Sequence, residues 1–196
     1  MLQNITKKRK KKSHRPNRGR ENFQETAPGY KYRKIKKVIQ KAKTEALSTN
    51  DLLTVLKGVK NFVGIFASNR IKFSSIEQLP IFLVVNLDPS YLPGSHWVAL
   101  RIGSKFVEIF DSLGFNHKLW PTYPKPLINF LASFSKSHNF IISPIIQQPN
   151  TYDCGLFCLL FILLRNTNSF SRIVAFFSRN LVKNRKILYH MLLKKK

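Results

Sequence analysis

Short apolar segments separated by polar or turn residues predict strands in the middle third of the chain. Residues 81–87 are dense in aliphatic and β-branched side chains, as is typical of a buried strand. Residues 95–102 and 105–112 predict two more strands, separated only by the Gly-Ser pair at 103–104. A two-residue connection that begins with glycine is typical of a tight hairpin turn. These segments predict the centre of a β-sheet.

Other apolar segments predict helices around this sheet. A Ser-Thr pair at 48–49 can cap a helix, and residues 127–136 and 171–193 have helical character. The apolar run that starts at Cys154 predicts a helix buried on all sides, whereas residues 140–146 predict another strand. Strands interspersed with helices indicate an α+β or a mixed α/β domain.

Composition divides the chain near residue 48. Residues 1–47 carry 16 Lys or Arg against three Glu and predict a basic, largely disordered tail, in which 30–47 could form a helix. Residues 48–196 form the predicted folded domain. The net charge of +25 favours binding to polyanions such as nucleic acid. A nuclear-import signal with a solvated basic surface explains the same charge, so charge alone defines no reaction.

The predicted hairpin brings a histidine and a carboxylate together. With residues 103–104 as the loop, His96 stands directly opposite Asp111 on the same face of the sheet. Opposite Cβ atoms lie about 4.5–5.5 Å apart, within reach of a hydrogen bond between the side chains. The carboxylate would fix the imidazole tautomer and stabilise imidazolium. Taken singly, His96 could be a structural residue at a strand end, and Asp111 could be a turn former.

Cys154 stands at the start of the apolar helix, after a polar loop. The free N–H groups and the dipole at a helix N-terminus favour thiolate over thiol. Gly155 leaves room for a substrate near the sulfur, and a glutamine just upstream, Gln147 or Gln148, could hold an oxyanion together with backbone amides. With the His–Asp pair as base, Cys154 is the predicted nucleophile of a cysteine peptidase.

The remaining features argue against other classes of protein. Cys158, one helical turn deeper, fits a small buried residue, and two cysteines are too few for a disulfide scaffold. The histidines lack the spacing of zinc ligands, so we expect no metal. We see no secretory signal, and no apolar run is long enough to span a membrane. We therefore expect a reduced intracellular chain without a membrane partner.

Three short motifs carry a resemblance to known proteases. The sequences SHW (95–97), FDSLGF (110–115) and QPNTYDCGLFC (148–158) resemble the adenovirus-type protease, adenain, and the related Ulp/SENP proteases of ubiquitin-like proteins. The order His, acid, Gln, Cys is that of this group, and the resemblance covers about 48–196. It implies a papain-like α+β core, with a mixed central sheet flanked by helices and the catalytic cysteine at the start of a buried helix.

The resemblance agrees with the three catalytic residues named above and adds two roles. A Ulp-like spacing selects Gln148 as the donor to the oxyanion, and an adenain-like spacing selects Gln147; we favour Gln148. Trp97 would line a narrow channel that admits a Gly-Gly-type substrate backbone, beside Gly155. Alternatively, Trp97 is simply a packed aromatic residue.

The two branches of this group imply different substrates. The Asp at 111 and the YDCG sequence favour the Ulp branch, whereas the compact domain and the basic charge favour adenain, whose group uses DNA as a cofactor. We expect a maturation endopeptidase that cleaves viral capsid or core precursors at Gly-containing sites, in the nucleus or virion of an infected cell. The chemistry needs no cofactor, and DNA and a non-covalent activating peptide are potential partners. The alternatives are a Ulp/SENP-like deubiquitinase or deSUMOylase, and a catalytically inactive, basic DNA-binding virion protein.

Overall fold

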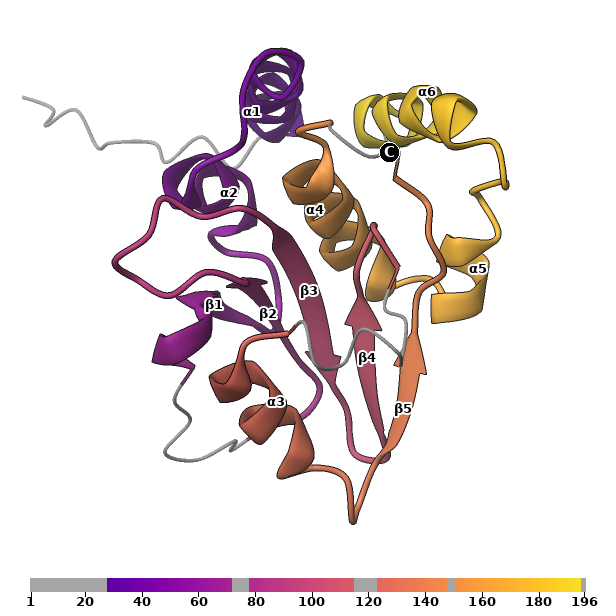
Figure 1. Cartoon of the computed structure of the whole chain (residues 1–196). Coiled ribbons are helices and arrows are strands. Elements are labelled where there is room, and N and C mark those ends of the chain that lie inside the picture. The colour runs from indigo at the N-terminus through magenta and orange to yellow at the C-terminus, as the bar shows by residue number, and fades with distance from the viewer. Residues whose placement is uncertain (1–27, 72–77, 115–122, 148–150, 195–196) are drawn as a thin grey trace, which may run out of the picture.

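A five-stranded mixed sheet forms the centre of the protein, in the order β1-β2-β3-β4-β5 (Figure 1). The computed structural model describes residues 28–71, 78–114, 123–147 and 151–194. Its strands are β1 (Phe62–Ala67), β2 (Ile81–Asn86), β3 (Trp97–Ile102), β4 (Phe106–Phe110) and β5 (Asn139–Ile142). The two outer pairs are parallel and the two inner pairs antiparallel. The predicted mixed sheet in an α+β fold is therefore confirmed.

Helices cover both faces of this sheet (Figure 1). They are α1 (Pro28–Lys41), α2 (Thr49–Leu56), α3 (Lys125–Ala132), α4 (Cys154–Arg165), α5 (Phe170–Val174) and α6 (Leu181–Leu193), with a short 3-10 helix, η1 (Ser68–Arg70). The helical region predicted at 171–193 contains two helices, α5 and α6. Within the described ranges, no helix is both long and apolar enough to cross a membrane.

The alternation of side chains along the strands creates two separate cores. On one face, Phe110 of β4 stacks on Phe161 of α4 with ring centroids 4.6 Å apart. On the other face, Leu100 of β3 belongs to the same cluster as Leu127 of α3. The first nine residues of α4 are all buried, as its apolar sequence predicts. This packing holds α4 firmly against the sheet.

The packed part of the chain begins earlier than its composition indicated. Ile35, Val38 and Ile39 of α1 are buried in the same core as α4, and α1 contacts α2 and α6. Their spacing is that of an amphipathic helix, hidden in the sequence by the surrounding lysines. The expected boundary at residue 48 therefore falls inside the packed region. Residues 1–27 of the expected tail lie outside the described residues.

The β3–β4 hairpin differs from the predicted register by two residues. Ile102 pairs with Val107, so the turn residues are 104–105 in place of 103–104. The prediction that the histidine and the aspartate stand directly opposite each other is therefore wrong. A shift of two preserves the alternation of side chains, so the two residues become diagonal neighbours on the same side.

Candidate active site

The ends of three elements meet at one end of the sheet. His96 immediately precedes β3, Asp111 immediately follows β4, and Cys154 is the first residue of α4. All three side chains are largely shielded, since the residues are 8%, 3% and 5% exposed, respectively. The fold thus brings together the three residues that the sequence predicted to cooperate.

The imidazole of His96 is hydrogen-bonded to the carboxylate of Asp111 and has the Cys154 thiol nearby. Its Nε2 forms a hydrogen bond of 2.7 Å with Oδ1 of Asp111. The Cys154 thiol lies close enough to the ring to influence its pKa, and Nδ1 is the ring nitrogen that the carboxylate does not occupy. His96 and Asp111 can approach each other although they are diagonal neighbours. Both lie just beyond the regular strands, where backbone hydrogen bonds between β3 and β4 no longer fix the distance between them.

The environment of His96 favours the protonated ring. Burial lowers the pKa of the imidazole, but the hydrogen bond to Asp111, the charge of that carboxylate and the interaction with Cys154 outweigh burial. Together they raise the pKa of His96 to about 9. At neutral pH the ring is therefore an imidazolium.

Several groups keep Asp111 ionised and oriented. The Tyr123 hydroxyl donates to Oδ2, and the Leu113 N–H donates to Oδ1 at 2.9 Å. Ser143 Oγ accepts from the Asp111 N–H at 2.8 Å and donates to its carbonyl at 2.6 Å. Burial raises the pKa of Asp111. The hydrogen bonds from His96 and Tyr123 and the imidazolium charge lower it by more, so the net pKa lies below the usual value of an aspartate. Tyr123 and Ser143 were not identified from the sequence, because no motif links them to the aspartate.

Helix α6 holds both ends of the loop that precedes α4. The buried carboxylate of Asp153 accepts from Arg185 Nε at 2.9 Å and from the Tyr189 hydroxyl at 3.0 Å. At the other end of the loop, Asn184 Nδ2 donates to the Ile146 carbonyl at 3.0 Å. The residue before the thiol is therefore fixed by a helix that the sequence had not connected with the site.

Of the two candidate glutamines, the structure describes only Gln147. Gln148, the favoured donor to an oxyanion, lies outside the described residues, so its role stays a prediction. Gln147 is buried, with Oε1 accepting from Ser112 Oγ at 2.5 Å and Nε2 donating to the Thr151 carbonyl at 3.0 Å. The amide of Gln147 is thus engaged in holding its own loop.

The two predicted substrate-binding residues both pack against the segment before α2. Trp97 is buried and its indole Nε1 donates to the Leu47 carbonyl at 2.8 Å. A Cβ atom at Gly155 would lie 3.1 Å from Leu47 Cδ1 and 3.3 Å from Leu52 Cδ2. The glycine therefore permits close packing of the protein on this side, and its expected contact with a substrate stays a prediction. A channel lined by Trp97 stays a prediction.

The second cysteine lies one turn further along α4. Cys158 is buried, as expected for a small core residue, and burial raises the pKa of its thiol well above the usual value. Neither cysteine forms a disulfide. In the described part of the chain, no three His, Cys, Asp or Glu side chains form a group that could hold a metal ion.

Similarity to solved structures is distant. A crystal structure of a protease from ASFV is 17% identical, with a TM-score of 0.47, and the match covers 79% of this chain and 70% of that one. A C-terminal Ulp1 protease domain, in complex with the yeast ortholog of SUMO, is 19% identical, with a TM-score of 0.31 and coverage of 85% and 76%. A Ulp1-like SUMO protease catalytic domain from Chaetomium thermophilum is 16% identical, with a TM-score of 0.27 and coverage of 57% and 45%. No curated protein sequence matches the chain.

The match to a protein family is more direct. Residues 73–172, just over half of the chain, match the Ulp1 protease family, C-terminal catalytic domain. The matched segment contains the histidine, the aspartate and the cysteine described above. Members of this family are cysteine peptidases that act on proteins and need no cofactor for catalysis. The chain belongs to the Ulp1 protease family.

Proposed function

We propose that this protein is a cysteine endopeptidase in which Cys154 is the nucleophile, His96 transfers the proton and Asp111 holds the imidazolium. One observation carries the proposal: a buried imidazole, hydrogen-bonded to a buried carboxylate, has its pKa raised to about 9 by that carboxylate and by the nearby Cys154 thiol. The positive charge of a protonated ring would stabilise negative charge that develops on a nearby sulfur atom during the reaction. The N-terminal end of α4 favours the same charge.

The proposed reaction proceeds through a thioester. The thiolate attacks the peptide carbonyl carbon, and the carbonyl electrons move to oxygen, where the N–H groups at the start of α4 and the Gln148 amide receive the charge. The C–N bond then breaks as His96 gives its proton to the leaving amine. Water next gives a proton to His96 and attacks the thioester, which releases the acid and restores the thiolate.

The test compares the two cysteines of the chain. Purified Cys154→Ala should lose cleavage of a Gly-Gly-x peptide, by about 10⁶-fold, as in other enzymes that lose their nucleophile. Cys158→Ala is the matched control, since it removes a buried thiol of the same helix and should keep cleavage. An iodoacetamide probe at neutral pH should modify Cys154 and spare Cys158. If Cys154→Ala cleaves as well as the unaltered protein, the proposal is wrong.

We further propose that the substrates are viral precursor proteins, cleaved at Gly-containing sites during virion maturation. The adenain-like motifs, the compact domain and the basic charge support this substrate class. Family membership favours a second candidate, a ubiquitin-like protein. Fluorogenic probes that carry the ubiquitin or SUMO C-terminus distinguish the two: faster turnover of a probe than of a capsid-precursor peptide favours the second candidate.

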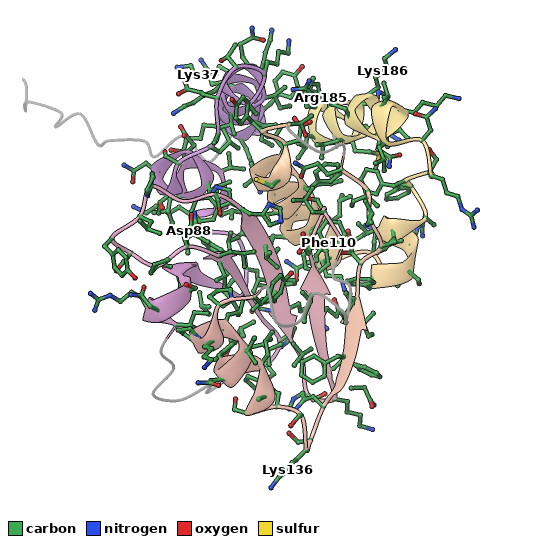
Figure 2. All side chains as sticks on the ribbon, viewed as in Figure 1. Lys37, Asp88, Phe110, Lys136, Arg185 and Lys186 are labelled. Carbon is green, nitrogen blue, oxygen red and sulfur yellow. The ribbon has the colours of Figure 1, made fainter. Side chains whose placement is uncertain are left out.

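We also propose that DNA binds along α1 and α6, in the nucleus or in the virion. α1 carries six Lys or Arg and α6 three, and neither helix contains an acidic residue. The two helices contact each other, and Figure 2 shows Lys37 and Lys186 directed outward at the same edge of the molecule. Such a surface, with the basic tail, suits a phosphate backbone.

Paired charge reversal tests the DNA proposal. Lys37→Glu with Lys186→Glu should weaken binding of duplex DNA and flatten its salt dependence, whereas Lys57→Glu, at an exposed lysine outside both helices, should have a smaller effect. A rise in peptide cleavage on addition of DNA, or of a non-covalent peptide, would indicate activation. Strong DNA binding by a protein that cleaves no peptide and resists alkylation would favour the inactive, DNA-binding alternative.

A further inference from the structure

A second site lies at the far end of α4, away from Cys154. A pocket of about 420 Å³ opens between the β3–β4 turn, β5 and the start of α5, and Arg165, the last residue of α4, lines it. The 12 residues of α4 separate this pocket from the thiol by about 17 Å, at 1.5 Å per residue. The proposed peptidase chemistry uses none of its side chains.

An ionic cluster around a buried carboxylate forms one wall of the pocket. Glu108 is 2% exposed and receives both Nε and Nη2 of Arg165, at 2.7 and 2.6 Å. Its cross-strand neighbour Arg101 donates through Nη1 to the same carboxylate at 3.0 Å. Two guanidinium groups therefore share one carboxylate.

The charges of this cluster do not balance. Two arginines against Glu108 leave one positive charge, and Lys105 at the rim of the pocket adds a second. Burial and the charge of Arg165 lower the pKa of Arg101. The charge of Glu108 raises it, but the net pKa remains below the usual value of an arginine. Among the described residues, Arg101 donates its only hydrogen bond to Glu108. Other N–H groups of its guanidinium thus remain available to a ligand in the pocket.

The remaining lining indicates which anion fits. Phe106 is 40% exposed and, with Phe170 and Ile141, gives the pocket an apolar wall. A phosphate monoester carries a charge of about −1.5 to −2 at neutral pH and would balance the two positive charges, whereas a carboxylate would balance only one. An exposed aromatic ring can stack on a nucleobase.

We propose that this pocket binds a nucleotide, with its phosphate monoester on Arg101 and Lys105 and its base against Phe106. The nucleotide can be a free molecule or the 5′-phosphorylated end of a nucleic-acid strand, because both present the same chemistry. The proposal is independent of the peptidase activity and of the surface on α1 and α6.

The experiment titrates the full-length protein with AMP, adenosine and inorganic phosphate by calorimetry. AMP should bind more tightly than either fragment. Lys105→Glu should weaken AMP binding by about tenfold or more, because it removes one charge-assisted contact and adds repulsion. Lys57→Glu is the matched control, an exposed lysine outside the pocket lining, and should bind AMP as the unaltered protein does. Phe106→Ala should weaken binding of AMP while leaving that of inorganic phosphate unchanged.

Two results would overturn the proposal. One is the absence of saturable AMP binding; the other is an equal loss in Lys105→Glu and Lys57→Glu, which would indicate attraction to the overall charge alone. Unchanged peptide cleavage by Lys105→Glu verifies that this variant folds. A single-stranded oligonucleotide with a 5′-phosphate, compared with its unphosphorylated form and with AMP, distinguishes a strand end from a free nucleotide.

Discussion

Two buried carboxylates, three positions apart, make different sites from similar parts. Glu108 within β4 is 2% exposed and Asp111 just beyond it is 3% exposed, and each accepts short hydrogen bonds from basic side chains. The partners of Glu108 are arginines, which keep their protons at any pH that the fold tolerates. The partner of Asp111 is His96, whose pKa of about 9 allows the ring to give and take a proton. A buried carboxylate alone therefore does not identify an active site; a titrating partner next to a nucleophile does.

Replacing each carboxylate by its amide should give the largest difference between the two sites, in catalysis for one and in stability for the other. Asp111→Asn should lower kcat/KM by about 10⁴-fold, as loss of the acid does in a serine-protease triad. Glu108→Gln should leave kcat/KM nearly unchanged but lower the free energy of unfolding by about 2–3 kcal/mol, because two half-buried guanidinium groups lose their buried counter-charge. Peptide cleavage and urea unfolding measure the two effects.

The pH dependence provides a control for this comparison. The His96 pKa is raised from 6.5 to about 9, so its contribution to stability is complete below about pH 6.5 and is lost as pH rises through 9. The kcat/KM of the unaltered protein should fall over the same upper range, as the imidazolium loses its proton. The falling limb should move to lower pH in Asp111→Asn and stay in place in Glu108→Gln. Equal movement in both variants would contradict the distinction.

Substitution of Gln147 and Gln148 tests which of the two side chains donates to the oxyanion. Gln148→Ala should lower kcat by about 10²–10³-fold if its amide receives the oxyanion. Gln147→Ala removes the contacts with Ser112 and Thr151 and should mainly lower stability, by about 1–3 kcal/mol, because buried polar groups lose their partners. Single-turnover kinetics and thermal unfolding measure these effects. The reverse result would assign the donor to Gln147.

The smallest expected effect concerns α6 and the residue before the thiol. Arg185→Ala leaves the buried Asp153 without its ion pair and should slow alkylation of Cys154 by about tenfold, with a matching fall in kcat and little change in KM. Arg185→Lys should restore part of the rate, and Lys186→Ala, the exposed neighbour, should leave it unchanged. If alkylation is unchanged in Arg185→Ala, the ion pair does not position the thiol.

Local patterns in the sequence were sufficient for the elements that carry the chemistry. The apolar run predicted a buried helix that starts at Cys154, because a helix with no polar face has no side for solvent. Alternation around residues 95–112 predicted the hairpin and placed His96 and Asp111 on one side. That conclusion survived the error in register because a shift of two residues leaves the face unchanged.

Only the tertiary structure shows which distant strands and side chains contact each other. β1 was not predicted, since most of its residues are only partly buried and its pairing is irregular at Gly64. The contacts of Tyr123 with Asp111, of Arg185 with Asp153 and of Arg165 with Glu108 join residues 12 to 57 positions apart. Spacing along a chain determines which face a side chain occupies. Which distant side chain it meets depends on the packing of whole helices against the sheet, and no local pattern contains that information.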